Sequence, residues 1–243
     1  MKIKRMLLVL AVGLSVVLSA LYASDTVPEG TLTVTVTPGA YWKTERGPQF
    51  AVWVEKADGT YVTTLYVTQR AAKKNWLFAP KDGRPESLPV WYHAVGSRPV
   101  TMEAVQDKTK TDAVTSATSG ASDAVRYSVR LPSCEQYVVK IEVNHSFDYN
   151  ESWPKKAKKG SAQYSGVNGQ PSVVYRGTLD TQSPEKGTGD AAAQIQPVIP
   201  TVLVPAGTGS VTGRDGELHN DLAGLTTALQ IITKAEASWS SAE

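Results

Sequence analysis

A group of polar side chains that could bind a metal ion follows an apolar, strand-like run near the middle of the chain. Its members are Asn144, His145, Asp148 and Asn150. Imidazole nitrogen and carboxylate or amide oxygen are common ligands of divalent cations, and Glu142 or Glu151 could complete the set. The spacing matches neither an EF-hand loop nor the two-histidine pattern of a zinc-binding helix. The residues therefore support a divalent-metal site at His145, Asp148 and Asn150, or else a structural turn.

In the second interpretation, Asp148 and Asn150 accept hydrogen bonds from backbone amides of the loop. The rings of the segment then pack over the end of the fold; they are Phe147, Tyr149 and Trp153. Three rings so close together are a burial potential that a mobile loop could not use. We therefore expect Asn144–Trp153 to be ordered whether or not an ion binds.

The histidines do not form a recognisable catalytic motif. His93 lies in the apolar run Val90–Val95, which predicts a strand with a buried, hydrogen-bonded ring. His219 follows a turn signal, Asp215-Gly216. The sequence contains neither a Gly-x-Ser-x-Gly elbow nor a His-Glu-x-x-His helix. We expect a protein that is not an enzyme.

The first residues have the organisation of a secretory signal peptide. A basic head precedes the uncharged run Met6–Leu18, and small residues follow at Ser19, Ala20 and Ala23. The run is short for a bilayer core of about 30 Å, which favours cleavage over anchoring. We expect residues 1–23 to act as a signal peptide that is cleaved after Ala20 or Ala23, which places the protein in the periplasm.

Composition limits what the remaining residues 24–243 can be, and we expect them to form a single domain. Cys134 is the only cysteine, so one chain can form neither an internal disulfide nor a thiolate metal cluster. Lys and Arg total 25 against 23 Asp and Glu, a net charge of +2. That balance predicts no nucleic-acid partner.

Strand patterns dominate the chain. Thr31–Thr37 alternates threonine with aliphatic residues, which predicts a half-buried strand. Asp58-Gly59 predicts a hairpin turn between two further strands. The other predicted strands are Phe50–Glu55, Tyr61–Thr68, Val90–Val95, Val125–Leu131, Tyr137–Val143, Ser172–Leu179 and Val198–Val204. The segment Asp221–Thr233 predicts one helical turn followed by a final strand. Together these elements predict an all-β, immunoglobulin-like antiparallel β-sandwich with long loops and at most one short helix.

Two tryptophans and two loops complete this picture. Trp53 and Trp91 lie inside apolar runs and are expected in the core. The polar segments Gly96–Asp123 and Pro154–Gly169 are expected to be loops. The second contains a cluster of lysines that could attract anionic lipid or cell-wall polymers; they are Lys155, Lys156, Lys158 and Lys159.

Several segments resemble a bacterial family of predicted periplasmic proteins of unknown function, some of whose members are labelled as flagellar hook-assembly related. The matching segments are Gln49–Glu55, Tyr61–Leu65, Asp112–Thr118 and Glu142–Glu151. The resemblance runs over most of the chain after the signal. It implies a secreted β-sandwich, with members found beside membrane redox or flavin-attachment proteins. A periplasmic or inner-membrane protein partner follows from it as an expectation.

Asp112–Thr118 is also similar to the acceptor motif of bacterial flavin transferases. In that motif an Asp is followed three residues later by Ser or Thr, then Gly, Ala, and the Ser or Thr that takes FMN in a phosphoester link. The similarity implies a site of Asp112, Thr115 and Thr118, with covalent FMN on Thr118. Ser116 stands where the motif has Gly, and Ser adopts the left-handed backbone conformation only at a cost of about 1 kcal/mol or more.

Two function classes follow from these patterns. The first is a non-catalytic binding or interaction module that uses loops at the ends of the sandwich. The alternative is a redox accessory that carries FMN on Thr118 or binds a divalent metal near His145.

Overall fold

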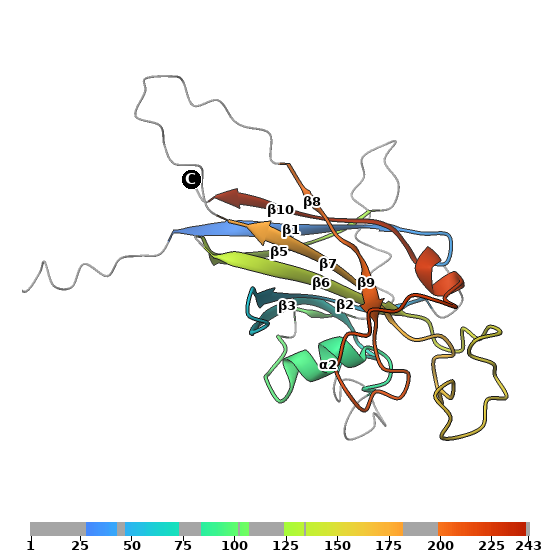
Figure 1. The fold of residues 1–243 in the computed structure, drawn as a ribbon. Coiled ribbons are helices and arrows are strands. Elements are labelled where there is room, and N and C mark those ends of the chain that lie inside the picture. The colour runs from blue at the N-terminus through green and yellow to red at the C-terminus, as the bar shows by residue number, and fades with distance from the viewer. Residues whose placement is uncertain are drawn as a thin grey trace, which may run out of the picture.

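Two largely antiparallel β-sheets packed face to face make up most of the regular structure (Figure 1). The computed structural model describes residues 28–42, 47–72, 84–101, 103–106, 124–133, 135–181 and 199–241. The four-stranded sheet has the order β5 (Val125–Pro132), β1 (Glu29–Pro38), β10 (Ile232–Ser241), β8 (Thr201–Val202). The six-stranded sheet has the order β4 (Val105–Gln106), β3 (Tyr61–Thr68), β2 (Gln49–Lys56), β6 (Gln136–Asn144), β7 (Val173–Asp180), β9 (Val204–Thr208). This confirms the predicted all-β sandwich.

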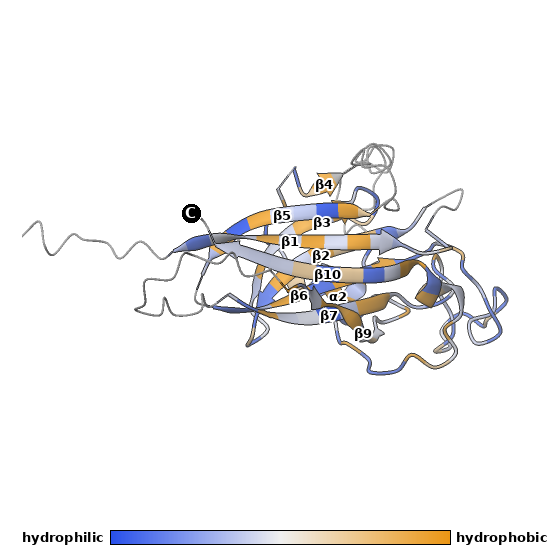
Figure 2. Cartoon of the chain, turned by 90° about the horizontal axis from the view of Figure 1, so that it is seen from above, coloured by the Kyte–Doolittle hydropathy of each residue, from blue (hydrophilic) through white to orange (hydrophobic). Residues whose placement is uncertain are grey.

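Alternation along the strands produces the core between the sheets. In β1, Leu32, Val34 and Val36 are fully buried, while the intervening threonines are only partly buried. Thr33 lies opposite Ser128 of β5, and their hydroxyls are 3.0 Å apart. Figure 2 shows the same alternation of hydropathy along β1 and β5. Each fully buried aliphatic side chain stabilises the fold by roughly 1.5–3 kcal/mol.

The predicted strand Val90–Val95 is wrong, because residues Pro89–Val95 form the helix α2. Pro89 occupies the first turn, where its fixed φ suits a helix and its missing N–H is not needed. Gly96, with φ of 55°, ends the helix and donates its N–H to the Tyr92 carbonyl. An apolar run this short does not distinguish strand from helix by periodicity. His93 is consequently exposed on a helix rather than buried in a strand.

Helix α2 covers the outer face of the six-stranded sheet and creates a second apolar core there. This core contains Ala51, Trp53, Val67, Leu88, Val90, Trp91, Val95 and Val174. Both tryptophans are fully buried, as the sequence predicts. Trp53 donates its indole N–H to Glu55 over 2.8 Å, and Trp91 donates to Thr64 over 3.0 Å. The indole nitrogens of Trp53 and Trp91 are therefore both paired, as their burial requires.

The end of the chain contains one confirmed prediction and one correction. The 3₁₀ turn η1 (Thr227–Gln230) precedes β10, as predicted for Asp221–Thr233. The run Val198–Val204 does not form one strand, because the chain crosses at the buried Leu203 from β8 to β9. Among the described residues, no helix has the length and apolarity needed to cross a membrane.

Candidate functional site

The long connection between β6 and β7, residues 145–172, is anchored where its two ends meet. We call it the β6–β7 loop; it lies at the end of the sandwich opposite the C-terminal end of β10 (Figure 1). Phe147 donates its backbone N–H to the Val167 carbonyl over 2.7 Å, and Gln170 donates to Asp148 over 2.9 Å. Gly169 has φ of 90° and lies against the Asp148 backbone, where a side chain would clash. The base of the loop is therefore a fixed structure.

Asp148 ties this base to the chain just before β10. The Thr227 hydroxyl donates to the Asp148 carboxylate over 2.6 Å, and the Gln170 side-chain amide donates to it over 2.7 Å. The side-chain oxygen of Gln170, Oε1, in turn accepts from the Thr226 backbone amide over 2.7 Å. A carboxylate that accepts several hydrogen bonds while partly buried is a strong local restraint. Asp148 thus locks the β6–β7 loop onto the sandwich.

Asn150 and His145 make separate contacts. Asn150 donates its side-chain amide to the Gly224 carbonyl over 2.8 Å, and its side-chain oxygen accepts from the Trp153 backbone amide over 2.9 Å. A ring nitrogen of His145 lies 2.6 Å from the Tyr41 carbonyl oxygen. Asp148 and Asn150 therefore face residues 224–227, whereas His145 faces Tyr41.

The predicted metal site at His145, Asp148 and Asn150 stays a prediction. Within the described part of the chain, no group of three or more His, Cys, Asp or Glu is placed to hold a metal ion. Residues 144–153 do form the ordered turn that we expect if no metal binds, because the Asn150 side chain accepts a hydrogen bond from the Trp153 backbone amide. Asp148 departs from that interpretation, since its carboxylate accepts from side chains. Phe147 also departs from it, because its side chain is 49% exposed.

The tip of the β6–β7 loop presents a cluster of positive charge. Its four lysines are exposed; they are Lys155, Lys156, Lys158 and Lys159. Two turns shape the tip, in which Ala157 donates to the Pro154 carbonyl and Ser161 to the Lys158 carbonyl, both over 2.9 Å. No ion pair joins these lysines to an acidic residue in the part of the chain that the structure describes. The lysine tip therefore carries four charges toward solvent.

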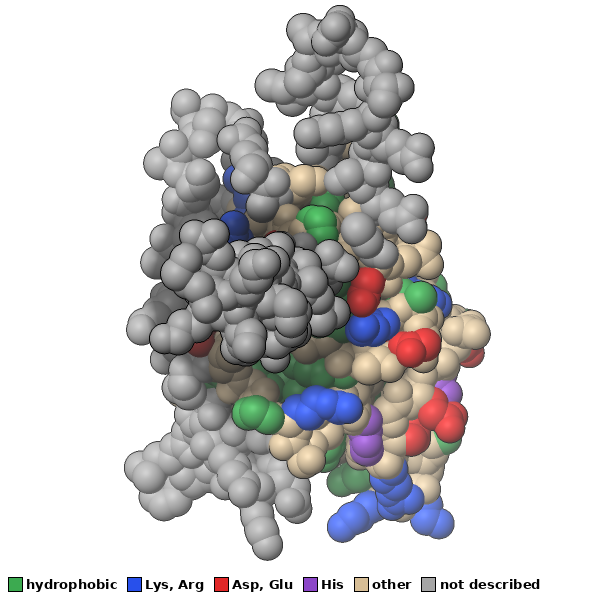
Figure 3. Space-filling model, turned by 90° about the vertical axis from the view of Figure 1, so that its left-hand side faces the viewer, with side chains coloured by type: hydrophobic (Ala, Val, Ile, Leu, Met, Phe, Trp, Pro, Cys, Tyr) green, Lys and Arg blue, Asp and Glu red, His purple; other side chains and the backbone are tan. Residues whose placement is uncertain are grey.

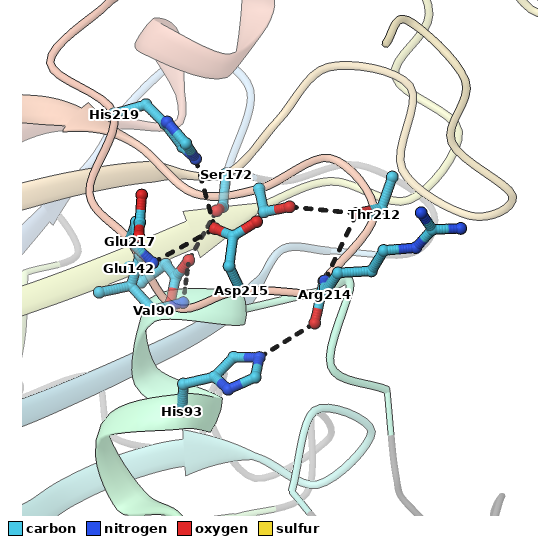
Figure 4. A network of polar contacts seen from close by, with 11 residues as sticks. Val90, His93, Glu142, Ser172, Thr212, Arg214, Asp215, Glu217 and His219 are labelled. Carbon is cyan, nitrogen blue, oxygen red and sulfur yellow. Dashed lines mark hydrogen bonds and ion pairs between the residues drawn. The ribbon is translucent and has the colours of Figure 1, made fainter. Parts of the chain in front are cut away.

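Glu142 is a fully buried carboxylate between β6 and α2 (Figure 4). It accepts hydrogen bonds from the Trp91 amide over 2.7 Å, from the Val90 amide over 3.2 Å and from the Ser172 hydroxyl over 2.6 Å. Burial raises the pKa of Glu142 to about 7, against the opposing effect of these hydrogen bonds and of Lys140. Glu142 thus accepts hydrogen bonds from two amides of the first helical turn, which have no acceptor within the helix itself.

Residues 209–219 wrap around α2 through close backbone approaches. Gly216 lies against the His93 side chain, and Gly213, with φ of 69°, lies against the backbone of Glu86. A ring nitrogen of His93 is 3.0 Å from the Gly213 carbonyl oxygen (Figure 4). Histidine side chains lie beside acidic and basic ones on the face in Figure 3. These contacts fix the segment 209–219 on α2.

His219 and Asp215 form an ion pair on this segment when the histidine is protonated. His219 Nε2 and Asp215 Oδ1 are 3.4 Å apart, and each side chain is nearly half exposed. Pairs this exposed contribute at most about 1 kcal/mol because water screens the two charges. The pair is a surface feature of the segment.

Other predicted functional residues lie outside the described residues. They are Asp112, Thr115 and Thr118 of the flavin motif, Cys134, and the signal peptide. Covalent FMN on Thr118 therefore stays a prediction, as does cleavage after Ala20 or Ala23.

Comparison with protein-family models, curated proteins and solved structures finds no match to this chain. The class that the fold defines is an all-β sandwich with one outer sheet face covered by a short helix. The resemblance to the family of periplasmic proteins stays a prediction.

From the sequence, Glu142 is predicted only as an optional metal ligand. Its buried structural role does have a signal in the sequence. Glu142 lies between Ile141 and Val143 in a strand whose neighbouring residues are apolar. Because neighbouring residues of a strand point to opposite faces, Glu142 lies on the other face of the sheet from Ile141 and Val143. A carboxylate there indicates that this face is also covered and that the carboxylate has hydrogen-bond donors nearby.

Proposed function

We propose that this chain is an exported, non-catalytic binding module of the periplasm, and that the β6–β7 loop is its binding surface. The observation that supports this proposal is the combination of a fixed loop base with an exposed, unpaired lysine tip. A loop held in one conformation loses little conformational entropy on binding. Its four lysines favour an anionic partner.

The partner that best suits the lysine tip is an anionic lipid surface. Clustered lysines near a negatively charged membrane contribute about 1 kcal/mol each. The ring of Phe147, at the base of the same loop, is also exposed, and an exposed aromatic ring can enter the membrane interface. Such binding needs no membrane-spanning segment. It would bring the sandwich to the inner membrane, where a protein partner could meet it.

Sedimentation with vesicles tests this proposal. The exported protein is mixed with phosphatidylcholine vesicles with or without phosphatidylglycerol, at low and high salt. The test variant is Lys155→Gln with Lys156→Gln. The matched control, Arg126→Gln with Arg130→Gln, removes two exposed positive charges from β5. We expect the lysine variant to lose roughly tenfold or more in binding to the anionic vesicles, and the arginine variant to bind like the wild type. Equal binding by the two variants, or no preference for anionic vesicles, would contradict the proposal.

A further inference from the structure

The outer face of the six-stranded sheet ends in a layer of buried polar side chains beneath residues 85–91. Glu142 and Asn144 belong to β6 and share this face, because the residues between and before them, Val143 and Ile141, point into the core between the sheets. The Glu142 carboxylate reaches the first turn of α2. Asn144 is 1% exposed. The layer therefore lies between β6 and the start of α2.

Two more buried polar residues come from other segments: Ser87 precedes α2, and Asn168 belongs to the β6–β7 loop. The Asn168 side-chain amide donates to the Glu86 carbonyl, so Asn168 lies against the segment that contains Ser87. Ser87 is fully buried, three residues before Val90, whose amide binds Glu142. The Asn144 amide donates over 3.1 Å to the carbonyl of Gln170, two residues beyond Asn168. These bonds place Asn168 beside the residue that precedes Ser87, and Asn144 beside the end of the β6–β7 loop.

Three oxygen atoms in this layer have no hydrogen-bond partner. They are Ser87 Oγ, Asn144 Oδ1 and Asn168 Oδ1. A buried polar atom without a partner costs about 1–3 kcal/mol, so three of them in one layer would be a large penalty. Native proteins resolve such atoms with an ordered water or an ion. The three oxygen atoms without partners therefore indicate that a water molecule or a cation lies among them.

The charge of the layer favours a cation as that ligand. Glu142 accepts hydrogen bonds from two backbone amides and one hydroxyl, all of them neutral. The ammonium of Lys140, two residues before Glu142 on β6, binds Glu55 over 2.6 Å. A buried carboxylate without a counter-ion of its own is costly. A positive ion beside it would offset that cost.

We propose that this layer binds one hard cation of the Ca²⁺ class, coordinated by oxygen atoms of Ser87, Asn144 and Asn168. Glu142 supplies the negative charge. Ca²⁺ takes six to eight oxygen ligands and accepts amide oxygens, backbone carbonyls and water. The three side chains offer neither imidazole nor thiolate, the ligands that zinc and softer metals prefer. The site is separate from His145, Asp148 and Asn150, and it is independent of the lysine tip.

Calcium titration of the chelator-treated protein tests this site. We expect isothermal titration to find one Ca²⁺ per chain. The unfolding temperature should rise with the concentration of free Ca²⁺, because a ligand that binds only the folded state stabilises it. A protein that takes up no Ca²⁺ and whose unfolding temperature does not respond to millimolar Ca²⁺ would overturn the proposal. The three oxygen atoms would then bind ordered water only.

A pair of variants shows whether any Ca²⁺ binds at this place. Ser87→Ala removes an oxygen atom that makes no hydrogen bond within the protein. Tyr127→Phe is the matched control, because it removes another buried hydroxyl without a partner, from the core between the sheets. We expect Ser87→Ala to weaken Ca²⁺ binding by roughly tenfold or more and to unfold like the wild type in chelator. Tyr127→Phe should bind Ca²⁺ normally. Ca²⁺ affinity that is unchanged in Ser87→Ala would overturn the assignment.

Discussion

The carboxylate of Glu142 accepts the backbone amide of Trp91 over 2.7 Å and so joins β6 directly to the first turn of α2. The two residues are 51 positions apart in the chain. Because α2 has only seven residues, it is too short to be stable in water alone. The buried carboxylate and the apolar contacts of Trp91 therefore hold the helix on the sheet.

We predict that this contact makes stability depend on pH. Burial raises the pKa of Glu142 from 4.5 to about 7 despite the hydrogen bonds from Ser172, Trp91 and Val90 and the charge of Lys140. A raised pKa means that the folded state favours the protonated form. The resulting stability is fully present below about pH 4.5 and is lost as the pH rises through 7. The loss should be about 3 kcal/mol in the free energy of unfolding.

Glu142→Gln is the control for this prediction, because glutamine cannot ionise. Urea unfolding of both proteins is measured in chelator between about pH 4.5 and pH 8. We expect any advantage of the wild type over the variant to shrink as the pH rises. Free energies of unfolding that run parallel over this range would show that Glu142 does not titrate there.

Asp148→Ala should lower the free energy of unfolding by about 1–3 kcal/mol, because Thr227 and Gln170 each lose a charged acceptor in a partly buried position. Asp215→Ala is the control, since Asp215 is nearly half exposed, and it should change stability by less than about 0.5 kcal/mol. Denaturant unfolding with and without chelator also tests the metal prediction for Asp148. A stability loss that disappears in chelator would indicate an ion at Asp148 in place of the structural role.

Gly209→Ala tests how closely residues 209–219 approach the sheet. A methyl group at this position would meet the Pro89 ring, the Ser172 hydroxyl and the Glu142 carboxylate. Overpacking of this kind costs typically 1–3 kcal/mol, so we expect a loss of about that size in urea unfolding. Gly166→Ala is the matched control, because only the Tyr164 hydroxyl lies near that position. The control should be neutral or slightly stabilising. Equal effects of the two substitutions would contradict the tight contact.

The sequence predicts the elements whose signal is local. β1 follows from its alternation of threonine and aliphatic residues, and the β2–β3 hairpin follows from Asp58-Gly59. In that turn, the Thr60 amide donates to the Asp58 side chain over 2.8 Å. The same strand-like reading failed for α2, because its amides find their partner in Glu142, 52 positions from Val90.

The candidate site depends on contacts that are still more distant. Asp148 meets Thr227, 79 positions away, and Asn150 meets Gly224, 74 positions away. Nothing near Asp148 in the sequence distinguishes a carboxylate that binds a threonine from one that binds a metal ion. Sequence reasoning therefore identified an ordered turn at Asn144–Trp153 but could not identify its partners. The same limit applies to the layer around Ser87, which three separate segments build.

The last prediction concerns Thr118, whose motif implies covalent FMN. If the transferase of the native host accepts this segment, the protein purified from that host should be yellow and its intact mass should exceed that of the unmodified chain by one FMN group. Thr118→Ala should abolish the added mass, because it removes the hydroxyl that forms the phosphoester. Thr63→Ala is a control that removes a threonine hydroxyl from β3, outside the motif, and it should keep the added mass. An unmodified mass for the wild-type protein, obtained from a host in which the transferase is shown to modify another substrate, would remove the redox alternative that rests on Thr118.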